Sequence, residues 1–441
     1  MTVPVAPGRW PAVGHTPAIL RHRLGFTASL RQYGDIVRID LGTMPAHVVT
    51  TPELVHRVLV TDGAAFEKGA MFDKFRAYVG NGLALSSGTF HRRQRRLMQP
   101  SFHRDELSRY LETMVRTATD LTGSWRPGEV REIDHDMQSV AVTIVGETLF
   151  SAGLGRAAIE EARQSIPVVI KYGMLRVLSP GLLEKLPIPA NRRFDEATAR
   201  MRAIVFELIA ERRASGVDHG DLLSRLLLAR DEDTGEGMTD EQVHDEVITL
   251  LSAGIETSAL ALAWIFHEIA RDPEVARRVH DEVDSVLAGE PVTFENIPRL
   301  EYVRRVVNET LRMYPLWILM RRAVTEVELG GLRLAPGDEV IISPHALHHD
   351  PHSYADPRRF DPDRWTPERA ASVPKGAYIP FGSGTRQCIG NSFALNEIIA
   401  VVATVTARWR LVPVPGKPVA VKVTSTAYPS RLPMTAIPRN P

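Results

Sequence analysis

Cys388 is the only cysteine in a chain of 441 residues, and it lies in a glycine-rich loop. A single thiol forms no intramolecular disulfide and cannot complete a site that needs several cysteines. Gly382, Gly384 and Gly390 remove side-chain bulk and permit unusual backbone angles. The loop can therefore press against a flat group while its N–H donors stabilise the thiolate, the form that binds metal. A helix expected over residues 391–410 would favour the same anion through its dipole.

A second candidate lies in a long predicted helix. Thr239 with Gln242 is a capping box, and the Asp272-Pro273 pair ends the helix after about 32 residues. Typical helices have about 11–12 residues. This helix is therefore long enough to cross the whole molecule.

The centre of this helix reads Ala253-Gly254-Ile255-Glu256-Thr257. Glycine disfavours a helix by about 1 kcal/mol relative to alanine, so Gly254 should have a compensating role. One such role is room for a small diatomic molecule beside the backbone. The alternative is close helix packing, with Glu256 in solvent. Thr257 is expected to bond to the carbonyl of Ala253 and to open the helix locally.

The cysteine loop resembles the haem-binding loop of the cytochrome P-450 family, Phe-x-x-Gly-x-Arg-x-Cys-x-Gly. All five fixed positions match: Phe381, Gly384, Arg386, Cys388 and Gly390. The resemblance implies haem b with its iron bound by the Cys388 thiolate, a ligand that favours O–O cleavage. It also implies that Phe381, Gly382 and Gly390 contact the cofactor. A buried, inert thiol is the alternative.

The helix centre resembles the family's oxygen-activating motif, which makes Ala253, Gly254, Glu256 and Thr257 the catalytic residues, with an acid–alcohol pair that relays protons. The implied activity is a monooxygenase that inserts one oxygen atom of O2 into a C–H or C=C bond. Electrons would come from NAD(P)H through a ferredoxin and its reductase, because no flavin, nucleotide or iron–sulfur motif is visible. A peroxide-driven enzyme or a haem-thiolate sensor would not need the Glu256–Thr257 pair, which argues against both.

Four basic side chains match family positions that contact haem propionates. They are His91 and Arg95, one turn apart on a predicted helix, together with Arg321 and Arg386. The Arg-x-Ala spacing at residues 321–323 favours Arg321 over Arg322.

The residues between and beyond His91 and Arg95 are also basic. Arg92, Arg93 and Arg96 are expected to face outward and to dock an acidic ferredoxin. A nucleic-acid role is disfavoured, because 53 basic residues balance 53 acidic ones and no aromatic residues are interleaved. Residues 230–236 are expected to form a flexible surface stretch.

Glu309-Thr310-Leu311-Arg312 resembles the family's Glu-x-x-Arg motif. We expect Glu309, Arg312 and Arg359 to form a buried three-way ion cluster that supports the cysteine loop. An exposed pair worth about 0.2–0.5 kcal/mol is the alternative. The role is structural and not catalytic.

By family position, the substrate pocket draws on several segments that carry few charges. Helical spacing can turn most of those charges, which include Lys68, outward, and this favours an apolar ligand held by shape. Residues 91–102 and 186–194 look similar to actinobacterial terpene-oxidising members. We therefore expect the substrate to be a terpene of sesquiterpene size from secondary metabolism. Fatty acids and macrolides are the alternative substrates. It is also possible to interpret the pocket residues as ordinary parts of the hydrophobic core. The pocket residues are Phe72, Phe75, Tyr78, Val169, Leu250, Trp317, Ile318, Leu319 and Tyr428.

Composition and patterning predict a mainly α fold with small β-sheets, the cytochrome P-450 fold. Hydrophobic residues make up 44% of the chain and charged residues 24%, as in ordinary globular proteins. Alternation and turn signals predict strands near residues 35–41, 47–50, 327–334, 338–343 and 419–437. We expect one domain over residues 1–441, with a Pro/Gly-rich segment 1–15 that lacks the apolar run of a membrane anchor. A monomer in the cytoplasm is the expectation.

Overall fold

The computed structural model describes residues 3–150, 155–178, 184, 186–315, 318–423 and 427–439. The chain forms two compact units, each assembled from stretches that are distant in sequence. Unit one contains Met1–Phe72, Glu301–Asn391 and Val419–Ser430, and unit two contains Asp73–Leu300, Ser392–Pro418 and Arg431–Pro441. The single domain over residues 1–441 stays a prediction.

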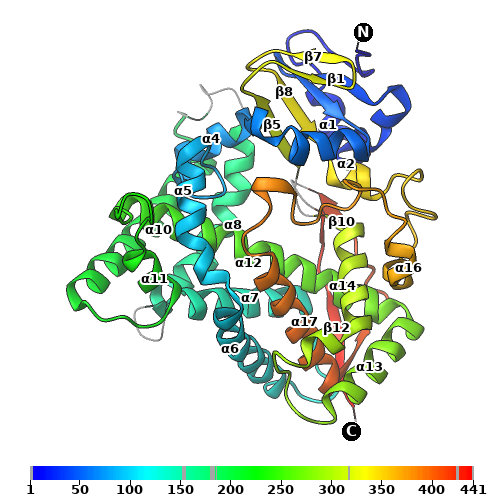
Figure 1. Cartoon of the computed structure of the whole chain (residues 1–441). Coiled ribbons are helices and arrows are strands. Elements are labelled where there is room, and N and C mark those ends of the chain that lie inside the picture. The colour runs from blue at the N-terminus through cyan, green and yellow to red at the C-terminus, as the bar shows by residue number, and fades with distance from the viewer. Residues whose placement is uncertain are drawn as a thin grey trace. The chain divides into compact units, whose positions relative to one another are not determined.

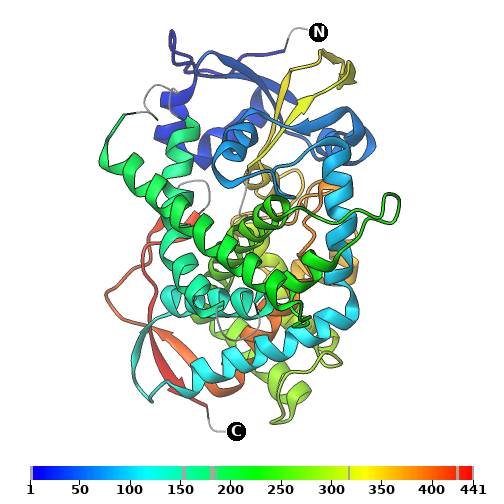
Figure 2. The same ribbon diagram turned by 90° about the vertical axis from the view of Figure 1, so that its left-hand side faces the viewer.

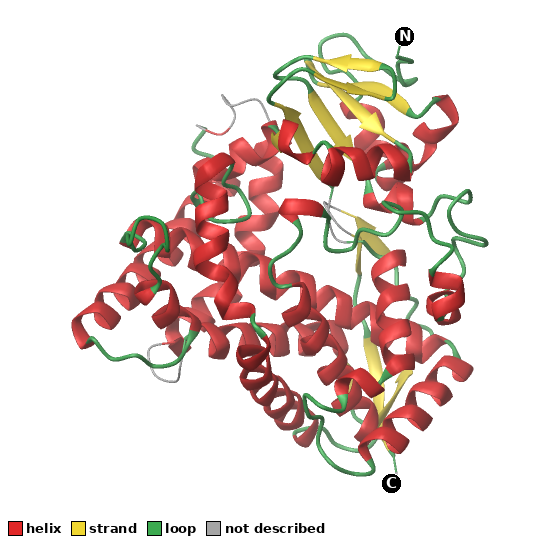
Figure 3. Ribbon diagram, in the orientation of Figure 1, coloured by secondary structure: helices red, strands yellow, loops and turns green. Residues whose placement is uncertain are grey.

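Unit one is built on a five-stranded sheet (Figure 3). The predicted strand pair is confirmed, with Ile36 opposite Val49 in an antiparallel register. Val49, Val340 and Ile342 belong to a buried apolar cluster that holds this sheet. The strand order is β1 (Ile36–Leu41), β2 (Met44–Val49), β8 (Glu339–Ile342), β5 (Leu319–Ala323) and β3 (Phe66–Lys68).

Short helices and hairpins complete unit one. The predicted two-glycine turn is present, since Gly330 and Gly331 have φ values of 55° and 78°. This turn joins β6 (Val327–Leu329) to β7 (Leu332–Leu334), and a second pair is β10 (Val421–Val423) with β11 (Ala427–Pro429). The helices are α1 (Thr16–His22), α2 (Leu24–Ala28), α3 (Pro52–His56), α14 (Glu301–Met313), α15 (Pro344–His348) and α16 (Pro367–Ala370), with the shorter η1 (Ser29–Tyr33), η2 (Arg57–Thr61), η3 (Gly63–Ala65), η6 (Pro362–Trp365) and η7 (Gly384–Arg386).

Unit two is helical, with one small sheet (Figure 1). Its longest helix, α12, packs against α7, and α10 runs beside α8 (Figure 2). The sheet has the order β4 (Val130–Glu132), β12 (Pro433–Pro438) and β9 (Trp409–Pro413). The helices are α4 (Ala70–Val79), which begins in unit one, and α5 (Gly88–Met98), α6 (Arg104–Gly123), α7 (Ile133–Leu149), α8 (Gly155–Leu178), α10 (Pro189–Ser215), α11 (Leu222–Leu228), α12 (Asp240–Arg271), α13 (Pro273–Leu287) and α17 (Asn391–Arg408), with the short η4 (Gln99–Phe102) and η5 (Ile297–Arg299).

The predicted limits of α12 are confirmed. The Thr239 hydroxyl accepts the Gln242 N–H at 3.2 Å, and the Gln242 side chain accepts the Thr239 N–H at 3.1 Å. The helix has 32 residues, and it is apolar and long enough to cross a membrane by composition alone. However, 61% of its apolar window is buried inside the protein, as expected for a core helix.

Candidate active site

The cysteine loop is fixed by backbone hydrogen bonds. The Cys388 N–H donates to the Phe381 carbonyl at 2.9 Å, and the Cys388 side chain is exposed. Gly384 has a φ of 68°, and a Cβ placed there would lie 1.9 Å from the Leu59 carbonyl oxygen in η2. Only glycine fits such an approach. The loop therefore presents an accessible thiol on a constrained backbone.

Helix α17 starts at Asn391, directly after the loop. The predicted start is thus confirmed, and its dipole favours a thiolate at Cys388. The predicted end at residue 410 is wrong. Trp409 and Arg410 belong to β9, where they pair with Pro438 and Ile437 of β12.

Three cations gather in unit one. Burial, followed by the charge of Arg386, lowers the pKa of Arg321 to about 10. Burial, followed by the charges of Arg321 and Arg386, lowers the pKa of Lys68 well below its ordinary value. Lys68 is therefore one of the pocket charges that does not turn outward; its ammonium lies 4.4 Å from the centre of the Phe72 ring. Like charges in one poorly solvated place destabilise each other unless an anion joins them.

Arg321 and Arg322 point to different partners. Arg322 forms an ion pair with Glu339 of β8 at 2.7 Å. Arg321 is 4% exposed and donates to the Met320 carbonyl at 3.0 Å. The cation cluster thus contains Arg321, and an accessible thiol together with such a cluster fits an anionic metalloporphyrin.

The Glu309–Arg312 pair is buried, and both side chains have no exposed area. Two guanidinium nitrogens donate to the Glu309 carboxylate at 2.9 and 2.8 Å. A third, Nη1, donates to the carbonyls of His348 and Pro357, each at 2.7 Å. The pair therefore fastens α14 to the segment that leads to the cysteine loop.

The prediction that Arg359 is the third member of this buried ion cluster is wrong. Its side chain is exposed, and only its carbonyl accepts from Arg312, at 3.2 Å. The guanidinium that faces Glu309 belongs to Arg364, at 3.4 Å, because the η6 turn carries this residue inward. The Trp365 indole N–H donates to the same carboxylate at 3.0 Å.

In unit two, the centre of α12 has the predicted internal hydrogen bond. The Thr257 hydroxyl donates to the Ala253 carbonyl at 2.7 Å. Burial raises the pKa of the Glu256 carboxyl. A Cβ on Gly254 would lie 3.0 Å from Cγ2 of Val145 on α7, so this glycine allows close helix packing. The room expected for a diatomic molecule on that face is occupied by Val145.

Helix α5 carries His91 and Arg95 one turn apart, with His91 buried and Arg95 partly buried. Arg92 and Arg96 are exposed, as expected, whereas Arg93 is partly buried. Arg93 donates to the Gly237 carbonyl at 3.0 Å. Arg96 pairs with Asp231 at 2.7 Å and with Asp233 at 2.8 Å.

The segment expected to be flexible is instead an ordered turn. The buried Asp231 carboxylate accepts the N–H groups of Asp233 and Thr234 at 3.1 and 3.2 Å. This acid also anchors Arg96, so the turn and α5 support each other. Arg92 stays exposed.

A cavity of about 50 Å³ lies in unit two between α8, α10, α12 and the end of α4. Of the predicted pocket residues, Tyr78 and Val169 line it, and Leu250 does not. Phe75 lies beside Gly173 instead. In unit one, Phe72 is buried, Leu319 packs on the apolar cluster, and Ile318 and Tyr428 are partly buried. Trp317 lies outside the described residues.

The sequence reasoning missed the place of Lys68 in the cation cluster, the contact of Arg364 with Glu309, and the position of His244 beside the cavity. Arg364 had a signal, because it precedes an aromatic residue in a turn-rich stretch. His244 is one of two histidines on α12 and lines the cavity.

A mainly helical chain with one accessible cysteine before a helix N-terminus, and with a cluster of cations in the same unit as that cysteine, fits the class of haem-thiolate proteins. A model of the cytochrome P-450 family matches residues 4–431. The chain belongs to the cytochrome P-450 family. It is a haem-thiolate monooxygenase that uses O2 and redox partners.

Individual relatives agree with this assignment. The chain is 46% identical to cyclooctat-9-en-7-ol 5-monooxygenase of Streptomyces melanosporofaciens, over 99% of this chain and 96% of the relative. It is 38% identical to pentalenene oxygenase of Streptomyces avermitilis, over 99% and 97%. Its fold is similar to that of the cytochrome P450DA heme domain, with a TM-score of 0.88 and 27% identity over 100% of this chain and 98% of that one.

Proposed function

We propose that this monooxygenase hydroxylates or epoxidises a terpene in secondary metabolism. The proposal rests on the lining of the unit-two cavity, which includes the aliphatic side chains of Ile166, Val169 and Ile248. One cation, Arg202, also lines the cavity, but two 2.8 Å hydrogen bonds tie it to Glu241. A fatty-acid carboxylate would therefore meet no unpaired cation among the cavity's described residues. The relatives that are terpene monooxygenases support the same substrate class.

The chain's own residues divide the remaining tasks. When bound, haem supplies the activation of O2 and the transfer of one oxygen atom to the substrate. Cys388 would hold the haem iron, and Arg321, Arg386, His91 and Arg95 would hold the propionates. Burial raises the pKa of the Glu256 carboxyl, so it holds a proton to a higher pH than an exposed glutamate does. The Thr257 hydroxyl can pass that proton on when it leaves the Ala253 carbonyl.

We infer that a ferredoxin and its reductase supply the electrons to a cytoplasmic monomer. Arg92 and Arg96 are both exposed, and the acids Asp231 and Asp233 offset the charge of Arg96, so we expect Arg92 to contribute most to docking. A comparison of turnover with ferredoxin, reductase and NADPH against turnover with hydrogen peroxide alone tests this inference. Faster turnover with peroxide would contradict it.

The substrate class is tested by titration of the ferric holoenzyme with terpenes, free fatty acids and macrolides, followed by the haem absorbance shift. We expect terpenes to give the tightest binding. Tight binding of fatty acids with no response to any terpene would overturn the proposal. Replacement of Cys388 by Ser should abolish the red-shifted band of the reduced carbon monoxide complex, because serine offers no soft anionic sulfur.

A further inference from the structure

His244 is a buried polar residue in an apolar part of unit two. It is 4% exposed, and its ring stacks on Phe206 of α10 with centroids 4.7 Å apart and planes 7° apart. Its Nδ1 atom lies 3.0 Å from Oδ1 of Asp245. Its Nε2 atom is buried and has no hydrogen-bond partner in the part of the chain that the structure describes. Buried ring nitrogens are nearly always satisfied, so this one requires an explanation.

The contact with Asp245 fixes the role of the free nitrogen. Oδ2 of Asp245 accepts the Asn81 N–H at 2.6 Å, so this carboxylate acts as an acceptor on both oxygens. Nδ1 of His244 must then carry the proton that it donates. In the neutral ring, Nε2 is therefore an acceptor, and its missing partner is a hydrogen-bond donor.

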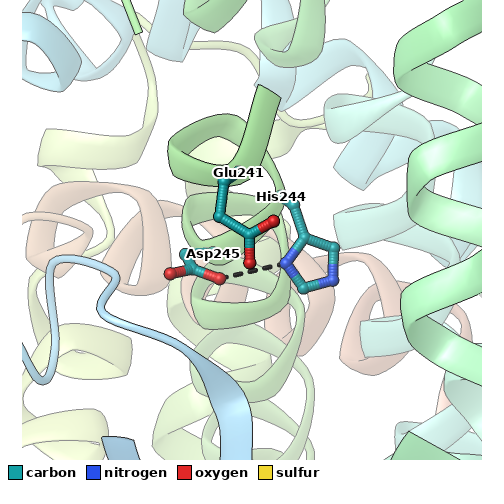
Figure 4. Close-up of side chains that lie close together, drawn as sticks. All are labelled: Glu241, His244 and Asp245. Carbon is teal, nitrogen blue, oxygen red and sulfur yellow. Dashed lines mark hydrogen bonds and ion pairs between the residues drawn. The ribbon is translucent and has the colours of Figure 1, made fainter. Parts of the chain in front are cut away.

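Figure 4 shows that Nε2 lies on the side of the ring away from the carboxylates of Glu241 and Asp245. These three residues lie close enough together to be considered as a cation site. However, Arg202 donates to the Glu241 carboxylate, and the Asn81 N–H donates to the Asp245 carboxylate. We therefore do not propose a metal site at this cluster. The missing partner therefore comes from elsewhere.

The cavity of about 50 Å³ adjoins His244 and is large enough for a hydroxyl group or a few waters. Two hydroxyl residues, Thr198 and Ser252, also line it. The Thr198 hydroxyl donates to the Phe194 carbonyl at 2.9 Å, which leaves its lone pairs available as acceptors. Apart from Arg202, which is tied to Glu241, the polar part of the cavity thus offers acceptors within a largely apolar wall.

We propose that this cavity binds a hydroxyl group of the substrate, which donates to Nε2 of His244. The inference rests on the proposed terpene function and refines it: the substrate is a terpene alcohol, and the hydrocarbon is not the preferred ligand. His244 is then a specificity residue. The reaction that supplies the substrate must leave a hydroxyl group on it.

The test uses the ferric holoenzyme and two matched probe sets, each titrated by the haem absorbance shift. One set is cedrene, cedrol and cedryl methyl ether, and the other is ent-kaurene, ent-kauran-16-ol and its methyl ether. An ether accepts but cannot donate, so it should lose the contact with Nε2. We expect an alcohol to bind about 10-fold more tightly than its ether, as expected for one buried hydrogen bond.

Two substitutions at His244 separate its ring nitrogens. Replacement His244→Asn keeps an amide donor near Asp245 but removes the acceptor at the Nε2 position, so the ratio of ether to alcohol Kd should fall to about one. Replacement His244→Gln extends an amide toward the Nε2 position and should retain part of the ratio. A separate variant, Ile248→Phe, keeps both side chains of the His244–Asp245 pair, fills the cavity and should also remove the alcohol preference.

An alcohol-to-ether ratio near one in the unmodified enzyme, or a ratio unchanged in His244→Asn, would overturn the inference and leave water as the partner of Nε2. Binding of the terpene hydrocarbons in those same titrations would leave the proposed terpene function intact. If no terpene of either set binds while fatty acids do, the proposed function itself fails, and this inference with it.

Discussion

Ser258 on α12 donates a 2.6 Å hydrogen bond from its hydroxyl to Oε2 of Glu397 on α17. Both residues are buried, and Oε1 of Glu397 has no partner among the described residues. Burial raises the pKa of Glu397 to about 8, and the Ser258 hydrogen bond only partly offsets this effect. The carboxyl therefore keeps its proton at neutral pH in the folded protein.

This relationship predicts a pH-dependent stability. The folded pKa of Glu397 lies above the ordinary value of 4.5, so its contribution is fully present below about pH 4.5 and is lost as the pH rises through about 8. Replacement Glu397→Gln should remove this slope, about 1.4 kcal/mol per pH unit, from the free energy of unfolding. Urea unfolding between pH 5 and 8 measures it. The exposed Glu207→Gln serves as the control, and an equal slope in both variants would contradict the assignment.

The Glu309 network predicts unequal roles for two nearby arginines. Replacement Arg364→Met should lower the free energy of unfolding by about 2 kcal/mol, because a buried carboxylate loses a charged hydrogen-bond partner. Replacement Arg359→Met should change it by less than about 0.5 kcal/mol, since that side chain is exposed. Chemical denaturation compares the two. A larger loss in Arg359→Met would restore the original assignment.

The cation cluster predicts opposite effects on the haem-free and haem-bound protein. Removal of the Lys68 charge in Lys68→Met should stabilise the haem-free form, because it relieves repulsion with Arg321 and Arg386. The same change should weaken haem retention, which transfer of haem to an excess of apomyoglobin measures. The control Arg322→Met breaks the ion pair with Glu339 and should destabilise the haem-free form. Unchanged haem retention in Lys68→Met would exclude the cluster as an anion site.

The Asp231 turn predicts local order that depends on α5. Replacement Arg96→Ala removes the ion pairs with Asp231 and Asp233, and should speed hydrogen exchange at residues 231–237. Replacement of the exposed Arg92 by Ala should leave that exchange unchanged. Equal exchange rates in the two variants would show that the turn orders itself without Arg96.

The centre of α12 predicts loss of coupling between electron consumption and product formation. Replacement Thr257→Ala removes the hydroxyl that donates to Ala253, and should lower product formation about 100-fold while NADPH is still oxidised and peroxide is released. Replacement Glu256→Gln removes the proton source and should act in the same direction. Unchanged product per NADPH in both variants would refute the proton-relay role.

The regular elements could be predicted wherever a local rule decides the structure. The capping box at Thr239 fixed the start of α12, and the Gly330–Gly331 turn fixed a hairpin. The partners of a side chain depend on tertiary packing, and local sequence patterns do not specify that packing. Arg359 and Arg364 are five positions apart in a turn-rich stretch, and only the path of η6 decides which one turns inward. Gly254 likewise needed the position of Val145 to be explained.

The shared carboxylate of Asp245 makes the cavity and a backbone segment thermodynamically coupled. One of its oxygens holds the His244 ring, and the other holds the Asn81 N–H. Glycines flank Asn81 on both sides. A Cβ on Gly80 would lie 2.0 Å from Asp245, and a Cβ on Gly82 would lie 2.1 Å from Thr249, so only glycine fits at these two positions. A ligand that fixes the His244 tautomer therefore also orders residues 80–82. By reciprocity, whatever orders residues 80–82 raises the affinity for that ligand by the same factor.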